Sequence, residues 1–94
     1  MVIGACTVEL LIPGNGSLKG KRRVVKSVVA RVSREFNVSI AEVDNQDLWQ
    51  RATLGISCVS TAPDHAHALL TQVVHWIEAN RPDVEVLEFH IETF

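Results

Sequence analysis

Three patterns in the sequence predict an α+β domain with four antiparallel strands and two helices on one face of the sheet. Apolar residues alternate with polar or small ones over residues 2–12 and again over residues 50–60, which is typical of strands with one buried face. Residues 17–36 and 61–79 instead repeat their apolar positions every three to four residues, as amphipathic helices do. Gly, Pro, Asn and Asp are frequent in the connecting segments, which are therefore predicted to be turns and loops.

The first strand is predicted over residues 2–12, with its even-numbered side chains facing inward. The sequence PGNG at residues 13–16 then turns the chain, and Ser17 is well placed as the N-cap of the helix that follows. A strand, a glycine-rich turn and a helix also surround a phosphate loop, but no two glycines here have the Walker A spacing. The turn is therefore not predicted to be part of an NTPase motif.

A hairpin and a second helix follow. Strands are predicted over residues 38–43 and 50–60, with a polar loop between them. Thr61 is the predicted N-cap of a helix that runs to about Ala79, because a proline and an acid follow it within three residues.

The last strand completes the sheet over residues 84–94. The alternation of inward-facing and outward-facing side chains is interrupted between Val86 and Leu87, which predicts a β-bulge or a bend. The order β-α-β-β-α-β with two helical crossovers is that of a ferredoxin-like domain, which we expect to span residues 1–94 and to leave one sheet face open. A fold so widely reused names no function by itself.

Composition sets limits on the class of protein. The 94 residues are 47% hydrophobic and 21% charged, which favours one small globular domain and argues against disorder. Nothing in the sequence resembles a signal peptide, and no apolar run approaches the roughly 18 residues that span a membrane. We expect a soluble, cytoplasmic protein.

The segment over residues 17–36 stands out by its charge. It holds seven of the nine Lys and Arg residues and a single acid, Glu35, so its formal charge is +6 in a chain of net charge −2. In a helix, most of these bases lie on the arc opposite the apolar stripe. Several fall in the first two turns, where the helix dipole favours acids rather than bases. Such a surface attracts anionic partners.

We expect this helix to bind the phosphates of structured RNA or of the ribosome, without reading base sequence. The residues predicted to take part are the N-cap and the bases of the first turns: Ser17, Lys19, Lys21, Arg22, Arg23 and Lys26. In the alternative interpretation, these bases pair with acids elsewhere on the fold. A third interpretation is a phosphate-ester or acyl-phosphate site at residues 14–17, for which no nucleophile or general base is identified. We therefore expect no enzymatic activity, no cofactor and no metal.

Several short segments of the chain form a recognisable set: the IPG turn of residues 12–14, SLK and KRR at residues 17–19 and 21–23, and FNVS, AEVD, DLWQRA and LG at residues 36–39, 41–44, 47–52 and 54–55. Taken together, they resemble the YlxP-like family of small uncharacterised bacterial proteins. These motifs cover about residues 2–60, and the rest of the chain agrees in length and pattern.

The resemblance implies a ferredoxin-like fold, no established catalytic activity, and genes that often lie beside those for translation initiation and ribosome maturation. That neighbourhood agrees with a basic helix that binds RNA. Gly20 departs from the family pattern, because a better helix former is expected at this position. A glycine inside a helix costs about 0.5–1 kcal/mol relative to Ala, so we expect a loose first turn.

Trp49 and Arg51 are candidate partner contacts in and after the polar loop. A loop tryptophan can stack on a base or dock a partner, and it can equally cap the end of the core. The open sheet face is expected to be fairly apolar, which burial in a homodimer would explain. Its central strands carry no aromatic ring, so RRM-like stacking of bases there is not expected. A homo-oligomeric interaction module that uses this face, without a nucleic acid, is the alternative function.

The cysteines are predicted to be structural, with a redox or metal role as the alternative, and the histidines indicate no metal or catalytic site. Cys6 and Cys58 occupy inward positions of strands, where a free thiol packs as a small hydrophobe. His65 and His67 point about 200° apart on their helix and cannot chelate one ion. His90 lies among acids on the last strand, but an acid–base pair there lacks a nucleophile.

Overall fold

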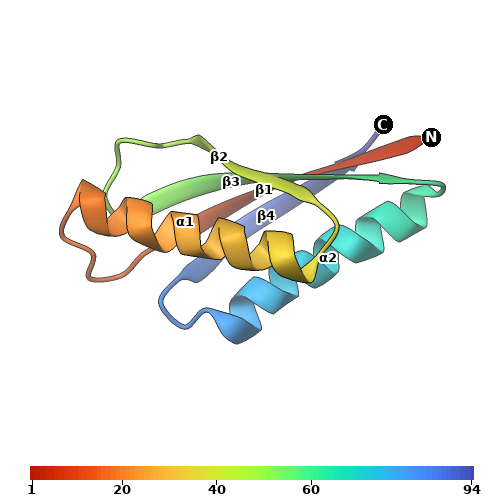
Figure 1. Cartoon of the computed structure of the whole chain (residues 1–94). Coiled ribbons are helices and arrows are strands. Elements are labelled where there is room, and N and C mark those ends of the chain that lie inside the picture. The colour runs from red at the N-terminus through yellow and green to blue at the C-terminus, as the bar shows by residue number, and fades with distance from the viewer.

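The computed structural model describes residues 1–94 and has the predicted order of elements (Figure 1). Its strands and helices are β1 (Val2–Leu11), α1 (Leu18–Glu35), β2 (Ser39–Asp44), β3 (Arg51–Ser60), α2 (Pro63–Asn80) and β4 (Glu85–Thr93). The strands form one antiparallel sheet in the order β2-β3-β1-β4. Both helices cover the same face of this sheet, and the other face is open (Figure 1). The prediction of a ferredoxin-like fold is confirmed.

The hydrophobic core lies between the sheet and the two helices, as the alternation predicts. Cys6, Val8 and Leu10 of β1 face the helices and are at most 2% exposed. Helix α2 packs tightly on the sheet at Gly4, where an added Cβ would lie 2.9 Å from Leu70 Cδ1 and 3.1 Å from Ala66 Cβ. Residue 4 must therefore be small for the helix to reach its position.

The two helices begin differently. The hydroxyl oxygen of Ser17 accepts the backbone N–H of Gly20 at 2.9 Å, so the predicted N-cap of α1 is confirmed. The prediction that Thr61 caps α2 is wrong by one residue, because the N-cap is Ala62 and no side chain caps the helix. Proline at position 63 disfavours helical backbone in the residue before it, which makes the extended Ala62 the boundary.

The bulge predicted in the last strand is present. Glu9 pairs with Glu88 and Leu10 pairs with Val86, so Leu87 is the extra residue of β4. The bulge lets apolar side chains face the core on both sides of the irregularity.

The open sheet face is built from the side chains that alternate with the core. Two rows of paired residues cross its middle: Ser39, Ser57, Ala5 and Glu92 in one row, and Ala41, Gly55, Thr7 and His90 in the other. Most of these side chains are small, and they line a shallow groove of about 540 Å³. At one end of the face the neighbouring Ile3, Val59 and Phe94 are 40%, 69% and 70% exposed.

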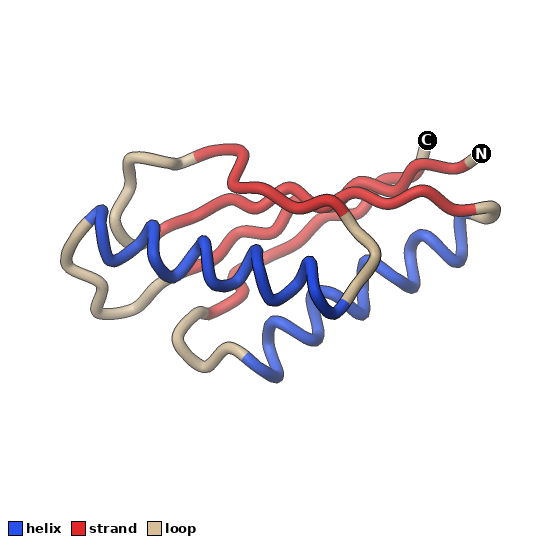
Figure 2. The backbone as a smooth tube through the Cα atoms, in the orientation of Figure 1, coloured by secondary structure: helices blue, strands red, loops and turns tan.

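The β1–α1 and β2–β3 connections lie at the same end of the molecule, opposite the two termini (Figure 2). Ile12 donates its backbone N–H to the carbonyl of Gln50 at 2.8 Å, which joins the two connections. The start of α1 and the loop that contains Trp49 are therefore brought together, although more than thirty residues separate them in the sequence.

Neither helix is long and apolar enough to span a bilayer.

Candidate functional site

Four exposed bases lie in the first half of α1, namely Lys19, Arg22, Arg23 and Lys26, and we call them the basic surface. Arg31 and Arg34 are exposed in the second half of the helix. None of the four has a carboxylate within 4.0 Å, since the ion pairs of the chain involve other residues. The first turn of α1 also lacks an acid. The alternative in which the bases pair with acids of the same chain therefore does not hold for these four.

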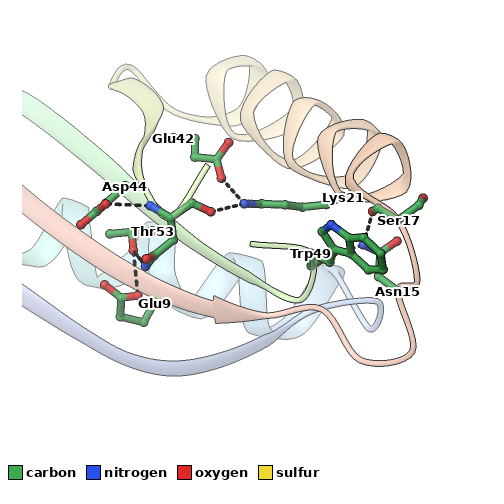
Figure 3. A network of polar contacts seen from close by, with 9 residues as sticks. Glu9, Asn15, Ser17, Lys21, Glu42, Asp44, Trp49 and Thr53 are labelled. Atoms are coloured by element: carbon green, nitrogen blue, oxygen red, sulfur yellow. Dashed lines mark hydrogen bonds and ion pairs between the residues drawn. The ribbon is translucent and has the colours of Figure 1, made fainter. Parts of the chain in front are cut away.

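Lys21 does not belong to the basic surface. Its side chain is fully buried, its ammonium lies 2.8 Å from Glu42 Oε2, and it also donates to the backbone carbonyl of Asn45 (Figure 3). Apart from this ion pair, the buried Glu42 Oε2 has no hydrogen-bond partner. The prediction that Lys21 contacts a phosphate is wrong, because its charge is enclosed and neutralised within the fold.

A polar network that the sequence analysis missed continues from this ion pair. Asn45 adopts a left-handed backbone conformation with φ of 60°, and its side-chain amide donates to Thr53 Oγ1 at 2.9 Å. Thr53 in turn donates to Glu9 Oε2 at 2.8 Å. The network therefore ties α1 to β2, β3 and β1 (Figure 3). A signal was present in the sequence, because Glu42 shares the inward phase of Ile40 on its strand.

Asn15 joins the start of α1 to the loop that contains Trp49. Its side-chain nitrogen donates to the carbonyl of Ser17 at 2.7 Å and to that of Trp49 at 2.6 Å. The side-chain amide of Gln50 donates back to the Asn15 carbonyl at 3.1 Å. The backbone of Trp49 therefore lies beside Asn15, and its side chain is 55% exposed (Figure 3). Trp49 therefore projects from a bridged pair of loops and is not part of the core.

Packing explains why residue 20 is a glycine. A Cβ at this position would overlap Oδ1 of Asn15 and would lie 3.0 Å from Ser17 Oγ. The missing side chain leaves room for the Asn15 amide to bridge both loops. Ser17 accepts both the Gly20 N–H through its hydroxyl and the Lys21 N–H through its carbonyl, so the first turn is capped in spite of the glycine. The expectation of a loose first turn stays a prediction.

Comparison with known proteins identifies the family of the chain. The model of a family of proteins of unknown function, DUF503, matches residues 3–91. The uncharacterized protein YlxP of Bacillus subtilis (strain 168) is 40% identical over 84 residues, which span 89% of this chain and 90% of that protein. This chain belongs to the DUF503 family. The resemblance to YlxP-like proteins is confirmed by the same two matches.

Solved structures share the fold of this DUF503 chain at low sequence identity. A de novo designed protein with a ferredoxin fold aligns with a TM-score of 0.58 and 17% identity, over all of this chain and 84% of its own. A putative chlorite dismutase aligns with a TM-score of 0.54 and 15% identity, over 99% of this chain and 44% of its own. Likeness at this level shows the fold alone.

The other residues singled out in the DUF503 sequence have structural surroundings. Trp76 packs edge-to-face on Phe36, with ring centroids 6.3 Å apart, and the Arg31 guanidinium lies 5.5 Å from the Trp76 ring centroid. Trp76 is therefore a residue of the core edge. Arg51 is exposed at the start of β3, and its role as a partner contact stays a prediction, as does anion binding by Ser17.

The groups that resemble catalytic ones are poorly placed for nucleophilic chemistry. Burial raises the pKa of the Cys6 thiol to about 11, so little reactive thiolate forms near neutral pH. His90 Nε2 lies 3.0 Å from Glu92 Oε1, but both side chains are more than half exposed. No cluster of three His, Cys, Asp or Glu side chains is arranged to hold a metal ion.

Proposed function

We propose that this DUF503 protein is a non-enzymatic cytoplasmic factor that binds structured RNA, on the ribosome or during its maturation, through the basic surface of α1. The observation that supports this proposal is that Lys19, Arg22, Arg23 and Lys26 are exposed together without an acidic partner. Four neighbouring cations repel one another in the free protein, and a polyanion relieves that repulsion while it releases counterions.

The charge of the basic surface sets the expected salt dependence. Each phosphate that the protein neutralises contributes about 0.7 to 0.9 to the slope of log K against log salt. Four contacts therefore give a slope of about −3 to −4. Lys21 does not contribute, because its charge is neutralised by Glu42. Phosphate contacts of this kind position an RNA without reading its sequence.

Co-sedimentation with ribosomal subunits and with extracted ribosomal RNA tests the proposal. The wild-type protein should sediment with one or both at low salt and be released at moderate salt. The Arg22→Glu/Arg23→Glu variant should stay in the supernatant at both salt concentrations. The proposal is overturned if the wild type does not bind, or if the charge-reversed variant binds as the wild type does.

A matched pair of variants separates the basic surface from net charge. Arg22→Gln/Arg23→Gln lowers the charge of the protein by two on α1. His65→Glu/His75→Glu lowers it by the same amount at pH 8, on the exposed side of α2. The first variant should bind more weakly and with a slope reduced by about 1.4 to 1.8, whereas the second should bind almost as the wild type.

Self-association through the open sheet face is a second candidate function. The observation that favours it is the adjacent exposure of Ile3, Val59 and Phe94 beside the groove. A second copy that covers this face would remove these side chains from water. Sedimentation velocity should then show a dimer that Val59→Lys dissociates, and a monomer at high protein concentration would contradict it.

A further inference from the structure

The indole of Trp49 is an exposed aromatic surface at the N-terminal end of the basic helix. It is 55% exposed, and the ring–ring and cation–ring contacts of the chain involve Trp76 instead. The Asn15 side chain donates to the backbone carbonyls of both Trp49 and the N-cap Ser17, from which the basic surface begins within two residues (Figure 3). The fold thus presents an exposed ring on a loop that is hydrogen-bonded, through Asn15, to the start of the basic helix.

The Trp49 loop is held in place from several sides. Asn15 holds the Trp49 carbonyl at 2.6 Å, and the next residue, Gln50, is bonded to both Asn15 and Ile12. At the other end of the loop, the Asn45 carbonyl accepts the buried ammonium of Lys21. A loop held in this way loses little backbone conformational entropy when its tryptophan binds a ligand.

The charge of the loop favours an uncharged group over a phosphate at the ring. Asp44 and Asp47 precede Trp49 in the sequence and Arg51 follows it, so residues 44–51 carry two acids and one base. This small net negative charge disfavours phosphate at the loop, whereas the basic surface attracts it. A nucleotide satisfies both conditions, since its base is a flat neutral ring and its phosphates can lie on the helix.

We propose that the RNA bound by α1 presents an unpaired base, and that this base stacks on Trp49. Every base has a π face, so such stacking tolerates any sequence. Bases inside a continuous duplex are already stacked and cannot reach the ring, so the preferred RNA has a single-stranded loop, bulge or end. This inference rests on the proposed function, because the phosphates of the same RNA occupy the basic surface.

Two RNA hairpins that differ only in their bases test the inference. Both have the same stem and a five-nucleotide loop, which carries adenines in one hairpin and abasic riboses in the other, so the phosphates are equal in number. Base–aromatic stacking should make wild-type binding of the adenine loop about 5- to 150-fold tighter. Trp49→Ala should bind both hairpins as weakly as the wild type binds the abasic one, and the salt dependence of its binding should be unchanged. Trp49→Phe should retain most of the preference for the adenine hairpin.

Further variants distinguish stacking from a structural effect. Leu48→Ala removes an exposed neighbour of the ring and should leave both affinities unchanged. Gly20→Ala displaces the Asn15 amide and should reduce the preference for adenine. In a Trp76→Phe background the remaining fluorescence comes from Trp49, and the adenine hairpin should quench it more than the abasic one.

The outcomes separate the two proposals. If the wild type binds both hairpins equally in a salt-dependent way and Trp49→Ala does the same, the stacking inference is overturned and the proposed function stands. A tryptophan that docks a protein instead would give this result. Equal weakening of both hairpins by Trp49→Ala also overturns stacking. If the wild type binds neither hairpin, nor ribosomal RNA, both proposals fall.

Discussion

Replacing Lys21 with Met should destabilise the fold although it removes a charge from a crowded basic helix. The ammonium lies 2.8 Å from Glu42 Oε2 and also donates to the Asn45 carbonyl, with no exposed surface. Its removal leaves a carboxylate in a mostly buried position without its partner. Removing one member of a buried ion pair typically costs about 3–5 kcal/mol. We expect about 3 kcal/mol here, because the Glu42 side chain is 15% exposed and can regain some water.

A double-mutant cycle tests the physical reason. Lys21→Met and Glu42→Leu should each cost about 3 kcal/mol of unfolding free energy, whereas the double variant should cost only about 1–2 kcal/mol. The residual cost reflects the Asn45 carbonyl, which loses a donor. Urea denaturation followed by circular dichroism measures all four proteins, and Lys26→Met on the exposed side serves as the control, with a change below about 0.5 kcal/mol. Additive costs in the double variant, or a Lys21→Met cost below about 1 kcal/mol, would refute the reasoning.

Three further predictions concern the rest of the fold. Cys6 and Cys58 are buried, and the pKa of Cys6 is raised to about 11. Ellman's reagent at pH 7.5 should therefore label neither thiol until urea is added, and rapid labelling of the native protein would contradict this. Gly4→Ala should cost about 1–3 kcal/mol in urea denaturation, because its Cβ would overlap α2; an unchanged midpoint would count against the close approach. The hydrogen bonds from Arg81 lower the pKa of Asp83 below its unfolded value, so this pair stabilises the fold above about pH 4 and the stabilisation is lost as the pH falls further. Asp83→Asn should therefore lose less stability than the wild type between pH 5 and 2, and parallel acid profiles would exclude that role.

Most of the fold could be predicted because it depends on local patterns. The alternation over residues 2–12, the cap at Ser17 and the bulge at Leu87 each follow from neighbours a few positions away. The N-cap of α2 lies one residue later than the predicted Thr61. Threonine favours the N-cap position, but Pro63 keeps the backbone of Ala62 extended, and this second constraint prevails.

The candidate site was predicted less completely, because parts of it depend on contacts between distant segments. Lys21 was grouped with the other bases by residue type, although it lies one helical turn before the buried Val25. Its partner Glu42 is on another element, and neither residue alone indicates an ion pair. Asn15 and Trp49 are 34 positions apart, so nothing local shows that they touch. The exposure of Lys19, Arg22, Arg23 and Lys26 depends on no such contact, so it could be predicted from the helical pattern alone.

The buried ion pair also specifies which residues of β2 face the core. This edge strand is short and is held by β3 alone, with an irregularity after Glu42, so its backbone bonds leave room for a shifted alignment. A shift by one residue would turn Glu42 toward water and bring a neighbouring side chain inward. The ammonium of Lys21 would then be enclosed without a counter-charge, which is far more costly than the loss of one apolar contact. A charged residue inside the domain thus acts against misalignment of its least supported strand.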